Sequence, residues 1–390
     1  MDTYSGENDT DCMQSLEDRY NSTLGVCSAF LPGVVTFARI IIPMWIALGV
    51  PGSLLSLLVW SSKPMRSSSS VYLCALAILD LMFLLCQQLP FHLYLYYDIK
   101  VMYNPFMCRA FPVYNMWLQY LSPLLTLGFT VERYIGICHP FSRKEFCTVR
   151  RAIIVVSCMT VACLVLGLVQ LHFYRYNPVE ATCSEDLRIF DPSTFEHRFY
   201  SGWSKLTEVL FFALAPVAIL VFNILVLVEA RRVIRKRPAG TGQRKSAATT
   251  ATLLTVSFYQ IGAVLPVTIL LFVGLAILTE APQLPCGIPD SDALHQITDG
   301  QWPVARSYLT YLTVSRIVDC LAVSHYAMKF VIYLATGQGF RRQLGQSLPR
   351  FLHCGSADDY DGIRQHRSQQ RRRKRAANSC LASDGTAMLP

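Results

Sequence analysis

Long runs of apolar residues dominate this sequence and limit what it can fold into. We place seven of them at about residues 37–60, 70–97, 108–138, 151–173, 203–230, 248–278 and 304–335. A helix of about 20 apolar residues crosses the roughly 30 Å hydrocarbon core of a bilayer. Because no water satisfies the backbone there, such runs must be helical. The sequence predicts an all-α membrane protein, a seven-transmembrane helix bundle.

The composition agrees with this environment. Of 390 residues, 52% are hydrophobic and 16% charged, whereas a soluble domain carries about 25% charged residues. The net charge of +9 suggests nucleic acid as a partner, but the basic residues gather in alternate connections and the tail. We therefore expect the lipid bilayer as partner and no nucleic acid. Most of the 14 cysteines lie in apolar runs and none has metal-ligand spacing, so we expect no metal and no cofactor.

Prolines interrupt several of the runs. In a soluble helix they would be breakers, but a membrane bundle tolerates them as kinks. They are Pro51, Pro90, Pro123, Pro216 and Pro266.

The loop charges predict the orientation. Basic residues occupy the first, third and fifth connections and the tail, including the run Arg371 to Arg375. By the positive-inside rule these sides are cytoplasmic. An odd number of spans then places the N-terminus outside, where the sequons at Asn8 and Asn21 can be glycosylated. The acidic N-terminus lacks a cleavable signal peptide, so we expect the first span to direct insertion.

Four regions follow from this topology. We expect an extracellular, glycosylated and unstructured N-terminus (1–35), a seven-transmembrane domain (36–337), a short amphipathic eighth helix on the inner leaflet (338–352) and a disordered cytoplasmic tail (353–390). Cys354 is either a palmitoylation site or an ordinary free cysteine.

The third run ends in Glu132-Arg133-Tyr134, followed by an inner loop with Phe141. With Cys108 placed 25 residues before Arg133, Asp80 in the second run, and Pro216, Pro266 and Tyr333 in the last three, this pattern resembles the rhodopsin-like G-protein-coupled receptors over about residues 35–350. The resemblance implies a Cys108–Cys183 disulfide, activation through the Glu132-Arg133-Tyr134 motif, and docking of a heterotrimeric G protein on Arg133 and Phe141. The alternative for Arg133 is a positive-inside anchor.

The chain also departs from that family. The sixth run has Ala263-Val264-Leu265-Pro266 where the family has Cys-Trp-x-Pro, and the seventh has Lys329 where the family has the Asn of Asn-Pro-x-x-Tyr. At the inner end of the sixth run, Ser246 replaces a common acidic residue. We hypothesise that Arg133 lacks an inter-helix ion pair and that resting activity is raised.

Lys329 is the most informative departure. A lysine inside a membrane needs a counter-charge, and the family places this position against Asp80, which commonly holds sodium. We hypothesise that the Lys329 ammonium takes the place of sodium; the alternative is that it snorkels to the inner surface. A retinal-binding lysine would stand at Val323 instead, so the resemblance does not extend to opsins. His325 is either a packed neutral residue or a proton switch.

Polar residues in the outer halves of the spans suggest the ligand. Intramembrane acids are candidates for function, although Arg316 is close enough in sequence to neutralise Asp319. Asn115 stands where amine receptors carry an aspartate, which disfavours a biogenic amine. Unpaired acids favour a cationic or amidated ligand. The ligand-binding candidates are Gln88, Asn115, Gln119, Glu208, Tyr311 and Asp319.

The segments 132–147 and 330–341 resemble receptors of the FMRFamide and thyrotropin-releasing-hormone types. This resemblance implies that the extracellular ligand is a short neuropeptide carrying arginine and a C-terminal amide. It also implies arrestin and receptor kinases as further partners, and a location in the plasma membrane. The alternative is a multi-span transporter or channel, but the halves show no internal repeat. No nucleophile–base constellation indicates an enzyme. We further hypothesise that Cys12 or Cys27 bridges to Cys286.

Overall fold

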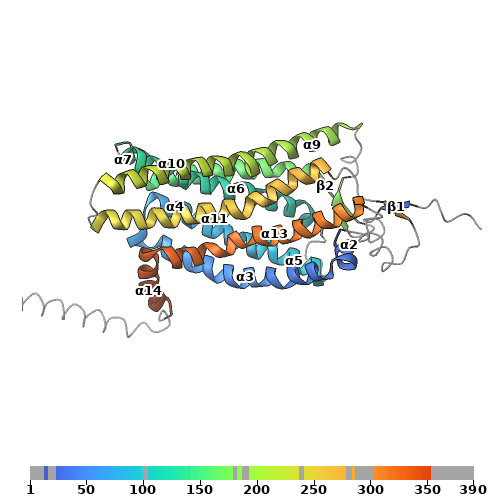
Figure 1. The fold of residues 1–390 in the computed structure, drawn as a ribbon, viewed down its shortest axis with the longest axis horizontal. Coiled ribbons are helices and arrows are strands. Elements are labelled where there is room, and N and C mark those ends of the chain that lie inside the picture. Colours follow the sequence, from blue (N-terminus) through green and yellow to red (C-terminus); the bar gives the residue numbers. More distant parts are fainter. Residues whose placement is uncertain are drawn as a thin grey trace, which may run out of the picture. The chain divides into compact units, whose positions relative to one another are not determined.

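Long helices run side by side through the protein (Figure 1). The computed structural model describes residues 13–15, 23–97, 99, 104–139, 141–178, 182–186, 193–236, 241–277, 283–285 and 303–352. The long helical segments are α3 (Pro32–Ser61), α4 (Ser68–Met82) continued by η3 (Phe83–Gln88) and α5 (Leu89–Tyr97), α6 (Pro105–Cys138), α8 (Val149–Gly167) with η4 (Leu168–His172), α9 (Phe195–Thr207) continued by η6 (Glu208–Leu214) and α10 (Ala215–Lys236), α11 (Thr241–Ile277) and α13 (Pro303–Thr336).

Each of the seven predicted runs lies in one of these helical segments. Six segments are long and apolar enough to cross a membrane. The seventh, α6, has 34 residues and is also long enough, but it carries more polar and charged side chains, among them Arg109, Glu132 and Arg133.

Short elements complete the described residues. They are the helices α2 (Thr23–Phe30), η2 (Lys63–Met65), α7 (Arg143–Phe146) and α14 (Gln338–Leu352) and the strands β1 (Met13–Ser15), β2 (Tyr174–Asn177), β3 (Thr182–Glu185) and β4 (Gln283–Pro285). α14 is helical where the eighth helix was predicted; its placement on a membrane surface stays a prediction.

Two spans contain a π-helical segment two residues before a proline. η3 ends at Gln88 before Pro90, and η6 ends at Leu214 before Pro216. A proline ring clashes with the carbonyl four residues earlier and leaves that carbonyl without a donor. A wider turn accommodates both effects without ending the helix. The kinks predicted at these two prolines are therefore taken up by π-helical turns.

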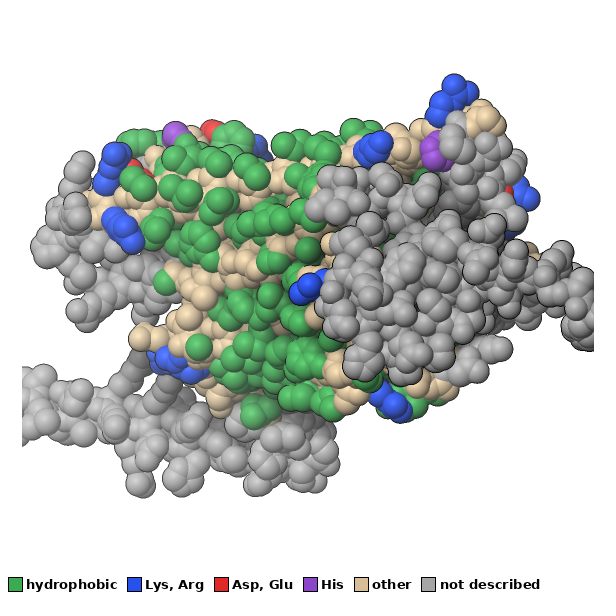
Figure 2. Space-filling model, turned by 45° about the vertical axis from the view of Figure 1, so that its right-hand side comes forward, with side chains coloured by type: hydrophobic (Ala, Val, Ile, Leu, Met, Phe, Trp, Pro, Cys, Tyr) green, Lys and Arg blue, Asp and Glu red, His purple; other side chains and the backbone are tan. Residues whose placement is uncertain are grey.

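The outer faces of the helices are apolar (Figure 2). Hydrophobic side chains cover most of the described surface in this view, as lipid-facing helices require. Inside the bundle, small residues bring helices close together. A Cβ atom on Gly52 would lie 2.8 Å from the Phe330 side chain, so this glycine lets α3 approach α13 closely.

One end of the bundle carries the β-strands and α2, and we call it the β2 end; the opposite end carries α7, and we call it the α7 end (Figure 1). At the β2 end, Cys183 of β3 forms a disulfide with Cys108 of α6, with 5.5 Å between the Cα atoms. The pair implied by the resemblance is thus present. It joins the β2–β3 hairpin, which pairs Tyr176 with Cys183, to the start of α6.

The N-terminal region was predicted to be unstructured, and for two segments this is wrong. β1 pairs antiparallel with β4, with Met13 opposite Pro285. α2 packs its Val26, Cys27 and Phe30 against the beginning of α13, in a buried cluster with Ala305, Tyr308, Leu309 and Leu312. An apolar face that a partner helix covers outweighs the polar composition of the surrounding segment. The predicted glycosylation sites Asn8 and Asn21, and the tail from 353 on, lie outside the described residues.

Candidate functional site

A cavity of about 320 Å³ lies within the bundle, a size typical of ligand sites. Six of the seven spans contribute to its wall, and α8 is the exception among the lining residues. Most of the wall is apolar. Its polar members are Gln87, Gln88, His92, Tyr96, Gln119, Ser122, Gln260, Arg316, Asp319, His325 and Tyr326.

Three of the six predicted ligand residues line this cavity: Gln88, Gln119 and Asp319. Asn115 adjoins it, because its Oδ1 accepts a hydrogen bond of 2.7 Å from Gln119 Nε2. Glu208 and Tyr311 are not among the lining residues. Tyr311 instead packs on Gly274, where an added Cβ would approach the tyrosine hydroxyl to 2.6 Å. A role for these last two in ligand binding stays a prediction.

Asp319 is the cavity's accessible carboxylate. It is exposed to the cavity, and no ion pair joins it to another described residue within 4 Å. Arg316, which the sequence offered as its neutralising partner, bonds to the Cys27 thiol of α2 and acts on Asp319 through its charge, without an ion pair within 4 Å. Asp319 therefore keeps its hydrogen-bonding capacity for a ligand.

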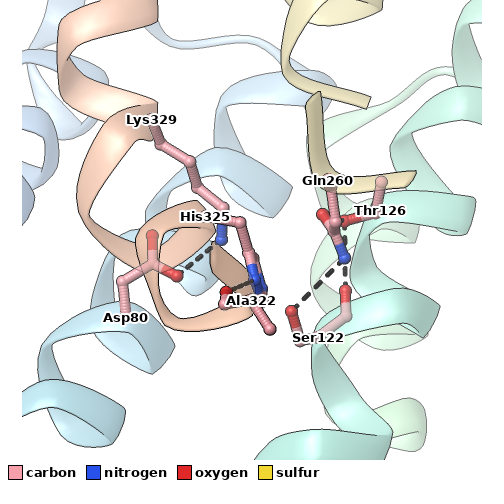
Figure 3. A network of polar contacts seen from close by, with 7 residues as sticks. All are labelled: Asp80, Ser122, Thr126, Gln260, Ala322, His325 and Lys329. Atoms are coloured by element: carbon pink, nitrogen blue, oxygen red, sulfur yellow. Dashed lines mark hydrogen bonds and ion pairs between the residues drawn. The ribbon is translucent and has the colours of Figure 1, made fainter. Parts of the chain in front are cut away.

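Deeper in the bundle, Lys329 of α13 donates to Asp80 of α4, with 2.5 Å between Nζ and Oδ1 (Figure 3). Both side chains are buried, with exposed fractions of 3% and 2%. The ammonium also lies 5.4 Å from the centroid of the Tyr326 ring, a cation–π distance. The direct pair is present, as the hypothesis required, and the snorkelling alternative is wrong because Asp80 supplies the counter-charge inside.

A second polar group joins α6 to α11 beside this pair (Figure 3). Thr126 Oγ1 donates to Gln260 Oε1 at 2.6 Å, and Gln260 Nε2 lies 3.5 Å from Ser122 Oγ. All three side chains are buried. The sequence does not predict these contacts, because a single glutamine, serine or threonine in an apolar run does not reveal which neighbour it meets. The one signal was Gln260 itself, an amide that needs a partner in lipid.

At the α7 end, Glu132 is bonded to α4 and not to the adjacent Arg133. Its Oε1 accepts hydrogen bonds from Ser68 Oγ at 2.7 Å and Ser69 Oγ at 2.5 Å. These serines begin α4, whose first turn is closed by a capping box between Ser67 and Ser70. A carboxylate at a helix N-terminus is favoured by the helix dipole.

Arg133 consequently has no ion pair with a described residue, and its Nε is buried without a hydrogen-bond partner. It lines a cavity of about 230 Å³ at the α7 end together with Glu132, Arg143 and the α4 serines. Ser246 lies within α11, but its side chain is outside the described residues, so the hypothesis on that residue stays a prediction.

The remaining motif residues occupy distinct places. Tyr134 packs edge-on against Phe222 of α10, at 5.3 Å between ring centroids. Phe141 is 96% exposed beside α7. Tyr333 is buried against Trp60 of α3, at 5.4 Å. Pro266 lies inside α11 without ending it.

Cys27 is a free, buried thiol. This excludes Cys27 from the bridge to Cys286 in this structure and leaves Cys12 as the partner to test. Both Cys12 and Cys286 lie outside the described residues.

A seven-helix membrane bundle with a mostly apolar cavity that carries a few polar groups between its spans is an architecture found in membrane receptors. Residues 53–305 match the model of the 7 transmembrane receptor (rhodopsin family), which is well over half of the sequence. The chain belongs to this family.

Similar curated proteins include receptors named for FMRFamide and for thyrotropin-releasing hormone. The FMRFamide receptor of Drosophila melanogaster is 25% identical over 353 residues, covering 83% of this chain and 58% of the relative. An FMRFamide peptide receptor of Caenorhabditis elegans is 26% identical, covering 45% and 42%. The thyrotropin-releasing hormone receptor of Mus musculus is 34% identical, covering 38% and 39%. The chain thus matches less than two thirds of each relative's length.

Proposed function

We propose that this protein is a plasma-membrane receptor that binds a short extracellular peptide and activates a heterotrimeric G protein. The observation that carries the proposal is the cavity between six spans, which presents the unpaired carboxylate of Asp319 beside the side-chain amides of Gln88 and Gln119. Carboxylate and amide groups fix the orientation of a ligand that the apolar wall desolvates. The names of the relatives support a peptide as that ligand.

The proposed orientation puts the β2 end outside the cell. The N-terminal sequons and the Cys108–Cys183 disulfide suit an extracellular, oxidising environment, and the α7 end carries the basic connections. The G protein would then meet Arg133 and the exposed Phe141. Arrestin and receptor kinases are proposed as further partners of the tail. Nothing in the family match supports the transporter or channel alternative.

A signalling assay tests this function directly. The full chain, tagged at the N-terminus, is expressed with a panel of G-protein reporters and exposed to a library of C-terminally amidated peptides that includes Phe-Met-Arg-Phe-amide. We expect a concentration-dependent response to at least one peptide, and N-terminal tags that antibodies reach on intact cells. A silent panel despite surface expression, or an N-terminal tag reached only after permeabilisation, would contradict the proposal.

A matched pair of variants tests whether the response comes from this receptor rather than from other receptors of the host cell. Arg133→Ala should abolish the response while surface expression persists, because this guanidinium is the proposed contact to the G protein. Arg232→Ala serves as control, because Arg232 is an exposed basic residue near the same end that pairs with Glu229 at 3.5 Å.

A further inference from the structure

The cavity wall contains buried hydrogen-bonding atoms that no described residue satisfies. They are Oε1 of Gln87, both ring nitrogens of His92 and Nε2 of His325. These side chains are 8%, 3% and 4% exposed, and all three line the cavity. A buried polar atom without a partner has lost its hydrogen bonds to water without replacement, which is unfavourable. Atoms of this kind, gathered in a cavity, indicate where a ligand forms hydrogen bonds.

The role of His325 follows from its other nitrogen. Nδ1 lies 2.5 Å from the carbonyl oxygen of Ala322 (Figure 3), and a carbonyl only accepts, so Nδ1 carries the proton. A second cation one turn from the Lys329 ammonium would be buried without a counter-charge of its own, which disfavours a doubly protonated ring. In a neutral ring with its proton on Nδ1, Nε2 is an acceptor.

The cavity wall is therefore rich in acceptors. His325 Nε2, Gln87 Oε1 and the two carboxylate oxygens of Asp319 all accept hydrogen bonds, and they come from the η3 and α13 sides. Asp80, the other carboxylate in this part of the bundle, is already occupied by Lys329. A group that fits here must carry a positive charge and several donors.

Two donor-rich cations are common in peptides, and the wall distinguishes between them. An ammonium group is compact and strongly hydrated, whereas a guanidinium is planar, weakly hydrated and stacks on aromatic rings. Phe91 lines the same cavity, as do Phe83 and Tyr326, which stack on each other at 3.7 Å between ring centroids and so present their edges rather than those faces. A guanidinium loses less hydration in such a wall and directs up to five N–H donors at separated acceptors.

Arg316 lines the same cavity one turn before Asp319. It bonds to Cys27 of α2, and its charge also acts on Asp319. A peptide carbonyl or another acceptor of the ligand can bond to Arg316 while the cationic group meets Asp319.

We propose that Gln87, His325 and Asp319 form a subsite for a guanidinium group, such as an arginine side chain of the peptide. This inference rests on the proposed function for the nature of the ligand, but the subsite itself is defined by the chain. The sequence alone assigned neither Gln87 nor His325 to the ligand.

Small probes test the subsite without knowledge of the natural ligand. The thermal unfolding of the purified, full-length receptor is measured with arginine amide, citrulline amide and lysine amide at millimolar concentrations. A ligand that binds the folded state raises the melting temperature. Arginine amide should bind about tenfold more tightly than citrulline amide, since the neutral urea lacks the charge-assisted bonds, and more tightly than lysine amide.

Variants then locate the binding. Asp319→Asn and Gln87→Met should each reduce the apparent affinity for arginine amide at least several-fold, while Glu229→Gln, which removes a carboxylate remote from the cavity, should not. The probe series on the unmodified chain stands even where a variant such as His325→Phe fails to fold. No shift with arginine amide, or equal shifts with all three amides, would overturn the subsite.

Failure of the subsite and failure of the proposed function give different experimental results. Stabilisation by arginine amide in a receptor that no peptide activates supports the subsite and contradicts the peptide function. A peptide response that keeps its potency in both Asp319→Asn and Gln87→Met supports the function and removes the subsite.

Discussion

Two aspartates in the bundle, Asp80 and Asp319, have opposite environments, although an ionised carboxylate is energetically unfavourable in a membrane at either position. Asp80 is buried, and Lys329 of α13 neutralises it at 2.5 Å. Asp319, on α13 itself, is exposed to the cavity and has no ion pair with a described residue. The chain thus supplies a counter-charge to the aspartate from which water is excluded. It leaves the other aspartate without one, where a ligand can enter. An intramembrane charge indicates a ligand site only when the structure leaves it unpaired.

Removing the ion pair between Asp80 and Lys329 should have the largest effect on stability. Lys329→Met leaves the Asp80 carboxylate buried without a cation, which lowers the free energy of unfolding by about 3–5 kcal/mol. The double variant Asp80→Asn/Lys329→Met should regain most of this loss, because it removes both charges. Thermal unfolding of the purified receptor measures the difference.

Asp319→Asn is the matched control for that experiment. Its side chain faces the cavity and has no intramolecular ion pair to lose, so its stability should change by less than about 0.5 kcal/mol. Two results would contradict the distinction between the two aspartates. One is a double variant no more stable than Lys329→Met, and the other is a large loss of stability in Asp319→Asn.

The dependence of ligand affinity on sodium also distinguishes a paired aspartate from a free one, and the expected effect is smaller. The Lys329 ammonium already occupies the Asp80 carboxylate, so the affinity for the most potent peptide of the amidated panel should be the same in sodium chloride and in choline chloride. Lys329→Asn frees Asp80 for a cation and should introduce a sodium dependence of about fivefold or more. Clear sodium dependence of the unmodified receptor would show that the ammonium does not replace the ion.

The smallest effect concerns Arg133, which like Asp319 has no ion pair with a described residue. Ser246→Glu offers it a carboxylate on α11 and should lower ligand-free signalling by about two- to fivefold, the effect of a pair worth up to about 1 kcal/mol. Ser246→Gln, which has the same shape without the charge, should leave ligand-free signalling unchanged. An equal response of the two variants would mean that charge plays no part.

The sequence predicted much of the fold because lipid imposes a simple requirement. The length and apolar content of the runs located all seven spans. The need of Lys329 for a counter-charge was a matter of physical chemistry, but it was the family resemblance that placed this lysine against Asp80, 249 positions away in the sequence. The cysteine spacing and the resemblance identified the disulfide between Cys108 and Cys183. These features depend on composition and on residues that have few acceptable partners.

Other features depended on which way each helix faces. Gln87 and His325 line the cavity, whereas Glu208 does not, and π-helical turns precede both Pro90 and Pro216. In lipid, a helix is apolar on most of its circumference, so periodicity does not fix its rotation. A π-helical turn rotates everything beyond it by a further fraction of a turn, which no count of residues anticipates.

The sequence by itself therefore determined that this chain spans a membrane seven times, and which buried charge had to be neutralised. Only the tertiary structure decided which polar side chains share a cavity, that Glu132 bonds to the serines of α4, and that Asp319 stays open to a ligand. The physical reason is that span formation is a local response of each segment to lipid. The rotation of each helix about its axis, and the side chains that it contacts, depend instead on how all the segments pack together.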